Sequence, residues 1–212
     1  MTFAEPRSDL ATTVPDLPDL PDLPNAPIER RVDAVQAAMD ERGMAASAAV
    51  DALSHSAQEE WVPHNGARLV ARAWVDPAFR ARLLTEGHQT VLDFGFTMPR
   101  HHRHFVVLEN SATVHNVICC TLCSCSAIRL LGLPPDWYKE LDYRARIVRE
   151  SRTVLREMGL VIDPAVELRV WDTTADTRYM VLPQRPAHTA GWSEAALAAI
   201  VTRDGMFGVA RL

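Results

Sequence analysis

The spacing of apolar residues predicts that the ordered part of the chain begins with helices. From residue 28 onward, apolar side chains recur every three or four residues, as they do along one face of an amphipathic helix. These residues are Ile28, Val32, Val35 and Met39, and Gly43 follows them in the position of a helix stop. We therefore expect the first helix to start at Ile28 and to end before Gly43.

Three further helices are predicted in the next part of the sequence. One lies within residues 46–57, a second lies around residues 69–74, and a third starts at Asp76-Pro77 and ends before Gly87. Aspartate is a favoured N-cap residue, and proline is favoured at the first helical position. The first half of the ordered chain is therefore expected to be all helical.

The second half changes to patterns that are typical of strands. β-Branched and aromatic residues fill residues 105–108 and 114–118, while residues 166–170 alternate and residues 179–182 form a further run. Helices are expected at residues 144–158 and from a Ser193 cap to residue 201. The fold class that follows is α+β, in which an N-terminal helical segment precedes a small mixed sheet with helices around a cysteine cluster.

The residues before the first helix have a different character. Residues 15–24 repeat the tripeptide Pro-Asp-Leu, which matches the three residues per turn of a polyproline II helix and would place Leu17, Leu20 and Leu23 along one edge. We expect residues 1–27 to be a proline-rich disordered leader or an arm that binds a partner subunit. Residues 28–212 would then form the folded domain.

Composition narrows the class of protein without identifying a function. Apolar residues make up 48% of the chain and charged residues 23%, and the formal net charge is −5. This mild acidity gives no reason to expect nucleic acid as a partner. No apolar run approaches the roughly 20 residues of a membrane helix, and residues 1–10 lack the apolar core of a secretory signal. We therefore expect a cytoplasmic protein that does not bind membranes.

All four cysteines lie within seven consecutive residues, at positions 119, 120, 123 and 125. Disulfides that stabilise a fold gain most by closing long loops, so this grouping argues against a disulfide framework. Structural zinc requires four protein ligands, usually in two separate pairs, and here the second pair is missing. His104 or His115 could complete such a site, so a non-catalytic zinc-binding protein stays an alternative.

The one-residue gap between Cys123 and Cys125 allows a different kind of metal site. The amide nitrogen of Cys125 can close a five-membered chelate ring with its own sulfur, and the nitrogen of Ser124 can close a six-membered ring with the Cys123 sulfur. Cys120 can then add an axial sulfur and leave the opposite position open. Such strong donors suit a small trivalent ion, and an open position suits Lewis-acid catalysis.

Residues 117–125 resemble the metal-claw motif of the α subunits of nitrile hydratases, and of the related subunit of thiocyanate hydrolase. The likeness runs from about residue 67 to residue 209. It includes residues 131–135, 137–139, 143–146, 169–172, 178–183 and 191–194. The resemblance implies that residues 28–212 are a nitrile hydratase α-like catalytic domain, which belongs to a metal-binding subunit that hydrates a nitrile to the amide.

The same resemblance implies a ligand set. Cys120, Cys123 and Cys125 would supply sulfur, while Ser124 and Cys125 would supply backbone nitrogen. Catalysis would involve Cys123, Ser124 and Cys125, with Cys123 oxidised to the sulfinate and Cys125 to the sulfenate. Thr121, the second residue of the motif, resembles the cobalt-type members, so the expected cofactor is Co³⁺, with Fe³⁺ as the alternative.

The resemblance also implies partners. A β-type nitrile hydratase subunit, as one chain or split into two, would complete the site, and an activator protein would insert the metal. Asp172 and Arg178 are expected to support the site or the interface rather than to catalyse. Cys119 is expected to be a buried small hydrophobe whose side chain points away from the claw.

Two segments depart from the family pattern and bear on the substrate. Ile128 stands where a tryptophan commonly lines the pocket, Arg129 adds a charge that small aliphatic nitriles do not need, and Arg100 replaces a glutamine. A substrate pocket with these three residues would take a bulky or nucleoside-like nitrile such as toyocamycin. Alternatively, Arg129 only pairs with the partner subunit. The remaining histidines of this segment, which are His101, His102 and His104, are expected on a basic surface loop without an assigned role.

An alternative activity follows from the shared claw. A metal subunit of thiocyanate hydrolase would convert thiocyanate to carbonyl sulfide and ammonia, and an assay for those products would distinguish it. A zinc-binding protein without catalytic activity would instead contain one zinc and no cobalt or iron.

Overall fold

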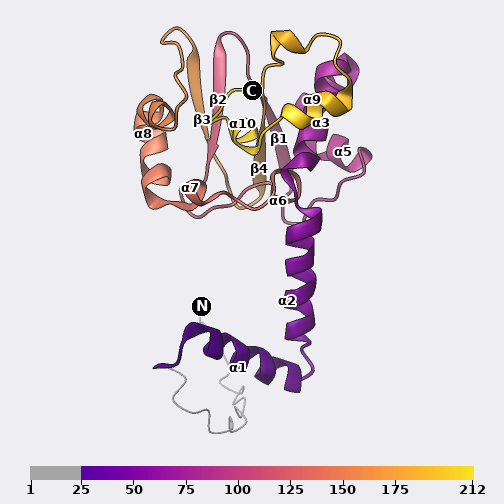
Figure 1. Ribbon diagram of the computed structural model, residues 1–212, viewed down its shortest axis with the longest axis vertical. Coiled ribbons are helices and arrows are strands. Elements are labelled where there is room, and N and C mark those ends of the chain that lie inside the picture. Colours follow the sequence, from indigo (N-terminus) through magenta and orange to yellow (C-terminus); the bar gives the residue numbers. More distant parts are fainter. Residues whose placement is uncertain (1–24) are drawn as a thin grey trace, which may run out of the picture. The chain divides into compact units, whose positions relative to one another are not determined.

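The computed structural model describes residues 25–212, so the Pro-Asp-Leu repeat lies outside the described residues. These residues belong to two compact units, of which the first ends at Ala52 and the second begins at Leu53 (Figure 1). Each unit has its own structure. The predicted division at residues 27 and 28 stays a prediction.

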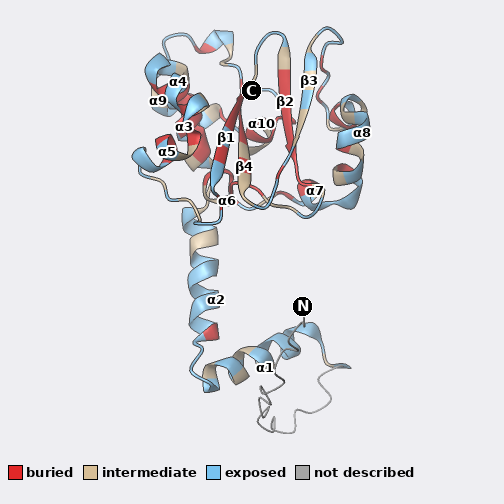
Figure 2. Ribbon diagram, turned by 180° about the vertical axis from the view of Figure 1, so that it is seen from behind, coloured by how far each residue is buried: buried red, intermediate tan, exposed pale blue. Residues whose placement is uncertain are grey.

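The first unit contains α1 (Ile28–Glu41) and the beginning of α2 (Ala46–His55). The predicted apolar residues do share one side of α1, and we call Ile28, Val32, Val35 and Met39 the apolar face of α1. No residue of α1 is buried, and Ile28 and Val35 are 60% and 58% exposed (Figure 2). An amphipathic helix is normally stabilised by covering such a face, so this one is available for a partner.

The second unit opens with helices, as the sequence predicts. They are η2 (Ser56–Glu60), α3 (Pro63–Val75), α4 (Pro77–Thr85) and α5 (Gly87–Asp93). The Asp76 carboxylate caps α4 by accepting a hydrogen bond of 2.9 Å from the Phe79 amide, which confirms the predicted start of that helix. Helix α3 buries Leu69 and Val70 completely and thereby joins the core.

Four strands follow the predicted pattern but pair in an unexpected way. They are β1 (His104–Glu109), β2 (Val114–Cys119), β3 (Glu167–Asp172) and β4 (Thr177–Leu182). Among the described residues β1 pairs with β4 and β2 pairs with β3, and both pairs are parallel. The α+β class is confirmed, and two parallel pairs take the place of one mixed sheet. Only residues 173–176 separate β3 from β4, yet the two strands belong to different pairs, because side-chain alternation does not specify a partner strand.

Helices surround these strands on several sides. They are α6 (Ile128–Leu131), α7 (Asp136–Lys139), α8 (Leu141–Glu157), η3 (Ala187–Thr189), α9 (Glu194–Ile200) and α10 (Arg203–Phe207). Helix α8 lies along β3, while α4 and α5 pack near β1, and α10 contacts β2 and β4 (Figure 1). None of the described helices is long and apolar enough to cross a membrane.

The short helix α6 is fixed in place by a close approach to α3. A Cβ atom added at Gly66 of α3 would lie 2.9 Å from the Leu130 carbonyl oxygen of α6, so a larger residue would push the two helices apart. The side-chain amide of Asn65 donates a hydrogen bond of 2.9 Å to the Arg129 carbonyl. Helix α6 follows the cysteine cluster directly, so these contacts also anchor one end of the cluster.

Candidate metal centre

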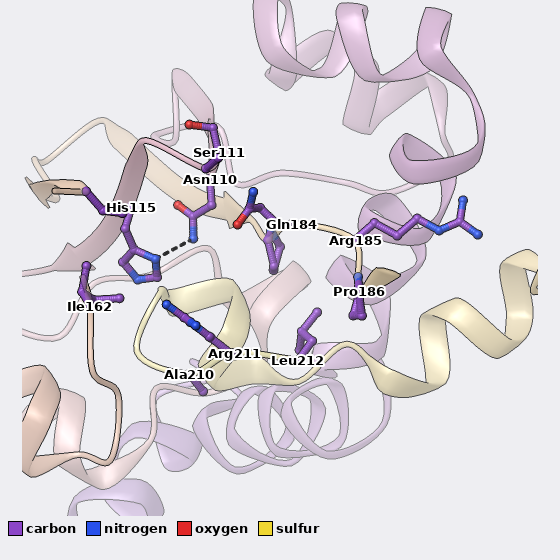
Figure 3. Close-up of a pocket in the computed structure, with 13 residues that line it drawn as sticks. Asn110, Ser111, His115, Ile162, Gln184, Arg185, Pro186, Ala210, Arg211 and Leu212 are labelled. Atoms are coloured by element: carbon purple, nitrogen blue, oxygen red, sulfur yellow. Dashed lines mark hydrogen bonds between the residues drawn. The ribbon is translucent and has the colours of Figure 1, made fainter. Parts of the chain in front are cut away.

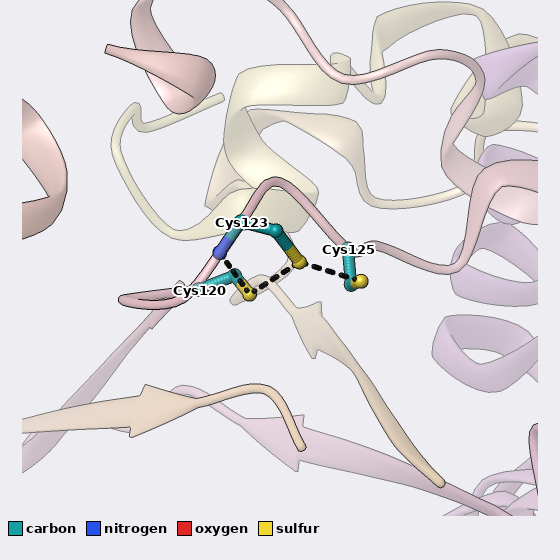
Figure 4. A group of neighbouring side chains, drawn as sticks. All are labelled: Cys120, Cys123 and Cys125. Carbon is teal, nitrogen blue, oxygen red and sulfur yellow. Dashed lines mark hydrogen bonds between the residues drawn. The ribbon is translucent and has the colours of Figure 1, made fainter. Parts of the chain in front are cut away.

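The three predicted ligand cysteines lie on one loop between the end of β2 and α6 (Figure 4). The Cys120 sulfur lies 3.3 Å from the Cys123 sulfur, which lies 2.8 Å from the Cys125 sulfur. All three sulfurs lie within 4.8 Å of one another, and no other group of three potential metal ligands occurs in residues 25–212. The loop therefore brings together the residues that the sequence predicted.

The separations between the sulfurs favour one kind of coordination over another. At a metal–sulfur distance of about 2.3 Å, two sulfurs at a right angle lie roughly 3.3 Å apart, whereas two sulfurs at a tetrahedral angle lie about 3.8 Å apart. The observed 3.3 Å matches the right-angled arrangement, and the observed 2.8 Å is shorter still, so both distances lie further from the tetrahedral value than from the right-angled one. The cluster fits a square-based claw better than tetrahedral zinc.

Backbone nitrogen is also available at this loop. The neighbouring Cys125 thiol lowers the pKa of Cys123, and the backbone amides of Cys125 and Ser124 lower it further because they are directed at its sulfur. Burial raises the pKa of Cys125 to about 11. The Cys123 sulfur is exposed, whereas Cys120 is buried. The donor set of three sulfurs and two amide nitrogens therefore fits a trivalent ion with one accessible face.

Three side chains hold the backbone of the loop in this conformation. The Arg144 guanidinium donates to the carbonyl oxygens of Cys120 and Thr121 at 3.0 and 2.9 Å. The Tyr138 hydroxyl donates to the Cys125 carbonyl at 3.1 Å. The Asp172 carboxylate accepts from Thr121. Of these three residues, the sequence predicted only Asp172 as a support. Tyr138 and Arg144 lie in α7 and α8, which contact the loop only in the folded structure.

Cys119 behaves as the sequence predicts. Its side chain is fully buried, and it does not belong to the group of three sulfurs. Burial raises the pKa of this thiol to about 12. A neutral thiol in the core is consistent with a small apolar residue rather than with a ligand.

Within residues 25–212, four buried polar side-chain atoms have no hydrogen-bond partner. Two belong to Ser126 and Arg129, which follow the claw in sequence, and two belong to His102 and Arg178. The atoms are His102 Nδ1, Ser126 Oγ, Arg129 Nε and Arg178 Nε. Ser126 follows the last ligand, and the positive charge of Arg178 acts on both Cys125 and His102. Arg178 is 4% exposed and donates to the carbonyl oxygens of Thr174 and Thr177.

His102 corrects the expectation of a basic surface loop. His102 is 4% exposed, whereas Arg100, His101 and His104 are exposed. Burial, together with the smaller effects of Arg178 and other neighbouring charged or titratable groups, lowers the pKa of His102 to about 4. His102 is therefore a neutral buried group near Arg178.

The residues predicted to line a substrate pocket do not form one cluster. Ile128 and Arg129 are half-buried in α6, whereas Arg100 is exposed. The Arg129 guanidinium donates to the Thr97 hydroxyl. It lines a hollow of about 140 Å³ that does not include Arg100.

The histidines proposed as zinc ligands are engaged elsewhere. His115 Nε2 donates to the Gly208 carbonyl at 2.8 Å, and its Nδ1 accepts from the Asn110 amide at 3.2 Å. It lines a cavity of about 340 Å³ near the start of β2, together with Arg211 (Figure 3). His104 is exposed and lies 4.0 Å from Asp176. Neither histidine completes a zinc site.

A loop that gathers three cysteine sulfurs beside two backbone amides at a strand end is a candidate metal-binding site. The chain belongs to the nitrile hydratase α-chain family of enzymes, because the model of the nitrile hydratase alpha chain matches residues 26–210.

Individual relatives carry different metals in their names. The low-molecular-weight cobalt-containing nitrile hydratase subunit alpha of Rhodococcus rhodochrous is 48% identical over 86% of this chain and 87% of its own length. The solved structure of an iron-type nitrile hydratase double mutant from Comamonas testosteroni Ni1 is 54% identical, covers 89% of this chain and 91% of its own, and superimposes with a TM-score of 0.85. Thiocyanate hydrolase subunit gamma of Thiobacillus thioparus is 42% identical over 70% of this chain and 65% of its own length.

Proposed function

We propose that this chain is the metal-binding catalytic subunit of a cobalt-type nitrile hydratase, which adds water across a nitrile to give the amide. The observation that carries the proposal is the claw, in which the sulfurs of Cys120, Cys123 and Cys125 lie within 4.8 Å of one another beside the Ser124 and Cys125 amides. When bound, Co³⁺ would supply Lewis acidity, and Fe³⁺ is the alternative. Thr121 favours cobalt.

The residues of the chain prepare the site in defined ways. Cys123 is exposed, so its sulfur is open to an external oxidant. We propose that dioxygen accepts the electrons and supplies the added oxygen atoms, so that Cys123 becomes a sulfinate and Cys125 a sulfenate. The positive charge of Arg178 acts on Cys125 and would stabilise an anionic oxidised sulfur. Arg144 and Tyr138 hold the loop carbonyls, so the sulfurs keep their positions while substrate binds.

The proposed substrate is a bulky or nucleoside-like nitrile such as toyocamycin. Ile128, which lies in α6 three residues after Cys125, leaves more room than a tryptophan would at this position. Arg129 adds a hydrogen-bond donor beside it.

A partner is part of the proposal. The claw is accessible, and Leu122 between Thr121 and Cys123 is 85% exposed. So large an exposed apolar side chain beside a site suggests that another chain covers it. We propose that a β-type nitrile hydratase subunit, as one chain or two, covers this loop and the apolar face of α1, and that an activator protein inserts the metal. The cytoplasmic location stays a prediction.

The test is an assay of the metal-loaded complex of this chain with its partner. We expect the wild-type complex to form the amide from benzonitrile and the Cys125→Ala complex to lose this activity. Arg149→Gln serves as the control, because Arg149 is exposed on α8 and donates only to the Ala145 carbonyl of its own helix. Release of carbonyl sulfide and ammonia from thiocyanate without amide formation would assign the chain to the thiocyanate hydrolase branch instead.

A further inference from the structure

The Arg129 guanidinium lies in a hollow next to the segment that follows the claw. Its Nη1 donates to the Thr97 hydroxyl, and its Nε is buried without a partner. A guanidinium has five N–H donors in a fixed plane, so most of this one is left to bind something else. The other residues that shape the hollow include Glu60, Trp61, Asn65 and Phe96.

No described carboxylate forms an ion pair with Arg129. Glu60 lines the same hollow but forms no ion pair with Arg129, and none of the ion pairs of residues 25–212 includes Arg129. A second cation is close, because the Arg68 guanidinium lies 5.3 Å from the centroid of the Phe96 ring. A partly buried cation without a counter-charge is costly, and an anion in the hollow would relieve that cost.

We propose that, among bulky nitriles, Arg129 selects one with a carboxylate or similar anionic group at the end remote from the cyano group, in preference to a neutral nucleoside such as toyocamycin. This inference rests on the proposed nitrile hydratase function. Arg129 lies four positions after Cys125, so their Cα atoms are at most roughly 14 Å apart, a span that a bulky nitrile with its anionic group remote from the cyano carbon could bridge. Trp61 and Phe96 provide apolar walls for the part of the substrate near the anion.

The position of Arg129 favours a small molecule over a residue of the partner subunit. The side chain is half-buried, and the hollow measures about 140 Å³, which suits a carboxyl group with part of a ring. The Asn65 amide donates to the Arg129 carbonyl, and the Arg129 guanidinium donates to the Thr97 hydroxyl, so both the backbone and the side chain of Arg129 have a partner within the chain. An arginine that pairs across an interface would be expected to project from the surface.

The test compares two nitriles of nearly the same shape with the metal-loaded complex. 4-Cyanobenzoate carries the charge, and methyl 4-cyanobenzoate does not. The ratio of their kcat/KM values should favour the acid in the wild-type complex and should fall about ten- to hundredfold in Arg129→Gln, because a charge-assisted hydrogen bond is lost. Arg129→Lys should keep part of the preference, whereas the control Arg149→Gln should leave the ratio unchanged.

The outcomes separate the inference from the function on which it rests. An unchanged ratio in Arg129→Gln would overturn the inference. If the same variant also bound the partner subunit more weakly in sedimentation experiments, Arg129 would instead belong to the interface. If the wild-type complex hydrates neither nitrile, the proposed function fails. Calorimetric binding of 4-cyanobenzoate to the wild-type and Arg129→Gln complexes would then still decide whether Arg129 holds an anion.

Discussion

The Asp172 carboxylate accepts two hydrogen bonds from Thr121, one of 2.9 Å from the backbone amide and one of 2.5 Å from the hydroxyl. Asp172 ends β3 and lies opposite Cys119, the last residue of β2. The carboxylate therefore ties the second residue of the claw loop to the neighbouring strand. The conformation of the loop depends on this strand pair as well as on a bound ion.

Asp172→Asn is expected to weaken metal retention by roughly ten- to hundredfold. The two Thr121 groups donate to different oxygens of the Asp172 carboxylate, and an asparagine replaces one of these oxygens with an NH2 donor, so one of the two hydrogen bonds is lost. The measurement is the rate of cobalt loss to a chelator. Asp33→Asn, an exposed substitution on α1, is the control. If Asp172→Asn held cobalt as long as the wild type does, the support assigned to this carboxylate would be wrong.

Substitution of Cys119 should show that this cysteine is part of the core and is not a metal ligand. Cys119→Ala removes a fully buried sulfur and should cost about 1–2 kcal/mol of unfolding free energy, because it leaves a small cavity. It should keep one cobalt per chain, whereas Cys120→Ala should lose the ion. Denaturant unfolding and elemental analysis measure the two effects. Loss of cobalt in Cys119→Ala would show that this thiol also acts as a ligand.

The stability of the chain should fall in mild acid because of His102. Its pKa lies at about 4 in the folded chain against about 6.5 when unfolded, so only the unfolded state gains a proton between these values. The stability that its neutral form contributes is complete above pH 6.5 and is lost as the pH falls to 4. The loss should reach up to about 3 kcal/mol, because each pKa unit corresponds to about 1.4 kcal/mol.

His102→Gln should remove this part of the acid sensitivity, while His64→Gln should not, because His64 is exposed and is not among the groups that act on His102. Urea unfolding at pH 7, 5.5 and 4.5 measures the difference. The charged or titratable groups that act on His102 are Arg178, His101, Arg129 and His88. Equal acid sensitivity of His102→Gln and wild type would contradict the assignment.

The apolar face of α1 should bind the partner subunit. Val35 is 58% exposed, so Val35→Glu should leave the stability of the isolated chain within about 0.5 kcal/mol of the wild type. The same substitution would bury a charge in a docked interface and should weaken association tenfold or more. Sedimentation equilibrium with the partner measures this affinity, and Arg30→Gln, on the opposite side of α1, is the control. Unaltered affinity in Val35→Glu would place the partner elsewhere.

The claw could be predicted from the sequence because its ligands are local. Residues 120–125 supply every proposed donor, so spacing alone indicates which atoms can surround an ion. The supporting side chains cannot be predicted in this way. Arg144 and Tyr138 reach the loop from helices that follow it, and their roles follow from tertiary packing.

The helices were predictable wherever local signals and packing agree. Gly87 indicated a helix stop, yet it is the first residue of α5. A Cβ atom there would lie 2.6 Å from the Phe105 carbonyl oxygen, so the glycine is required by the close approach of α5 to β1 rather than by a turn. The burial of His102 and the pairing of the strands likewise depend on residues distant in sequence.

X-ray absorption of the purified complex, combined with elemental analysis and intact mass, tests the central claim most directly. We expect one cobalt per chain, bound by three sulfurs and by lighter donors that include the amides of residues 124 and 125, and three oxygens added to the chain. An active complex without a transition metal, or one zinc with four ligands and unmodified cysteines, would contradict the claw.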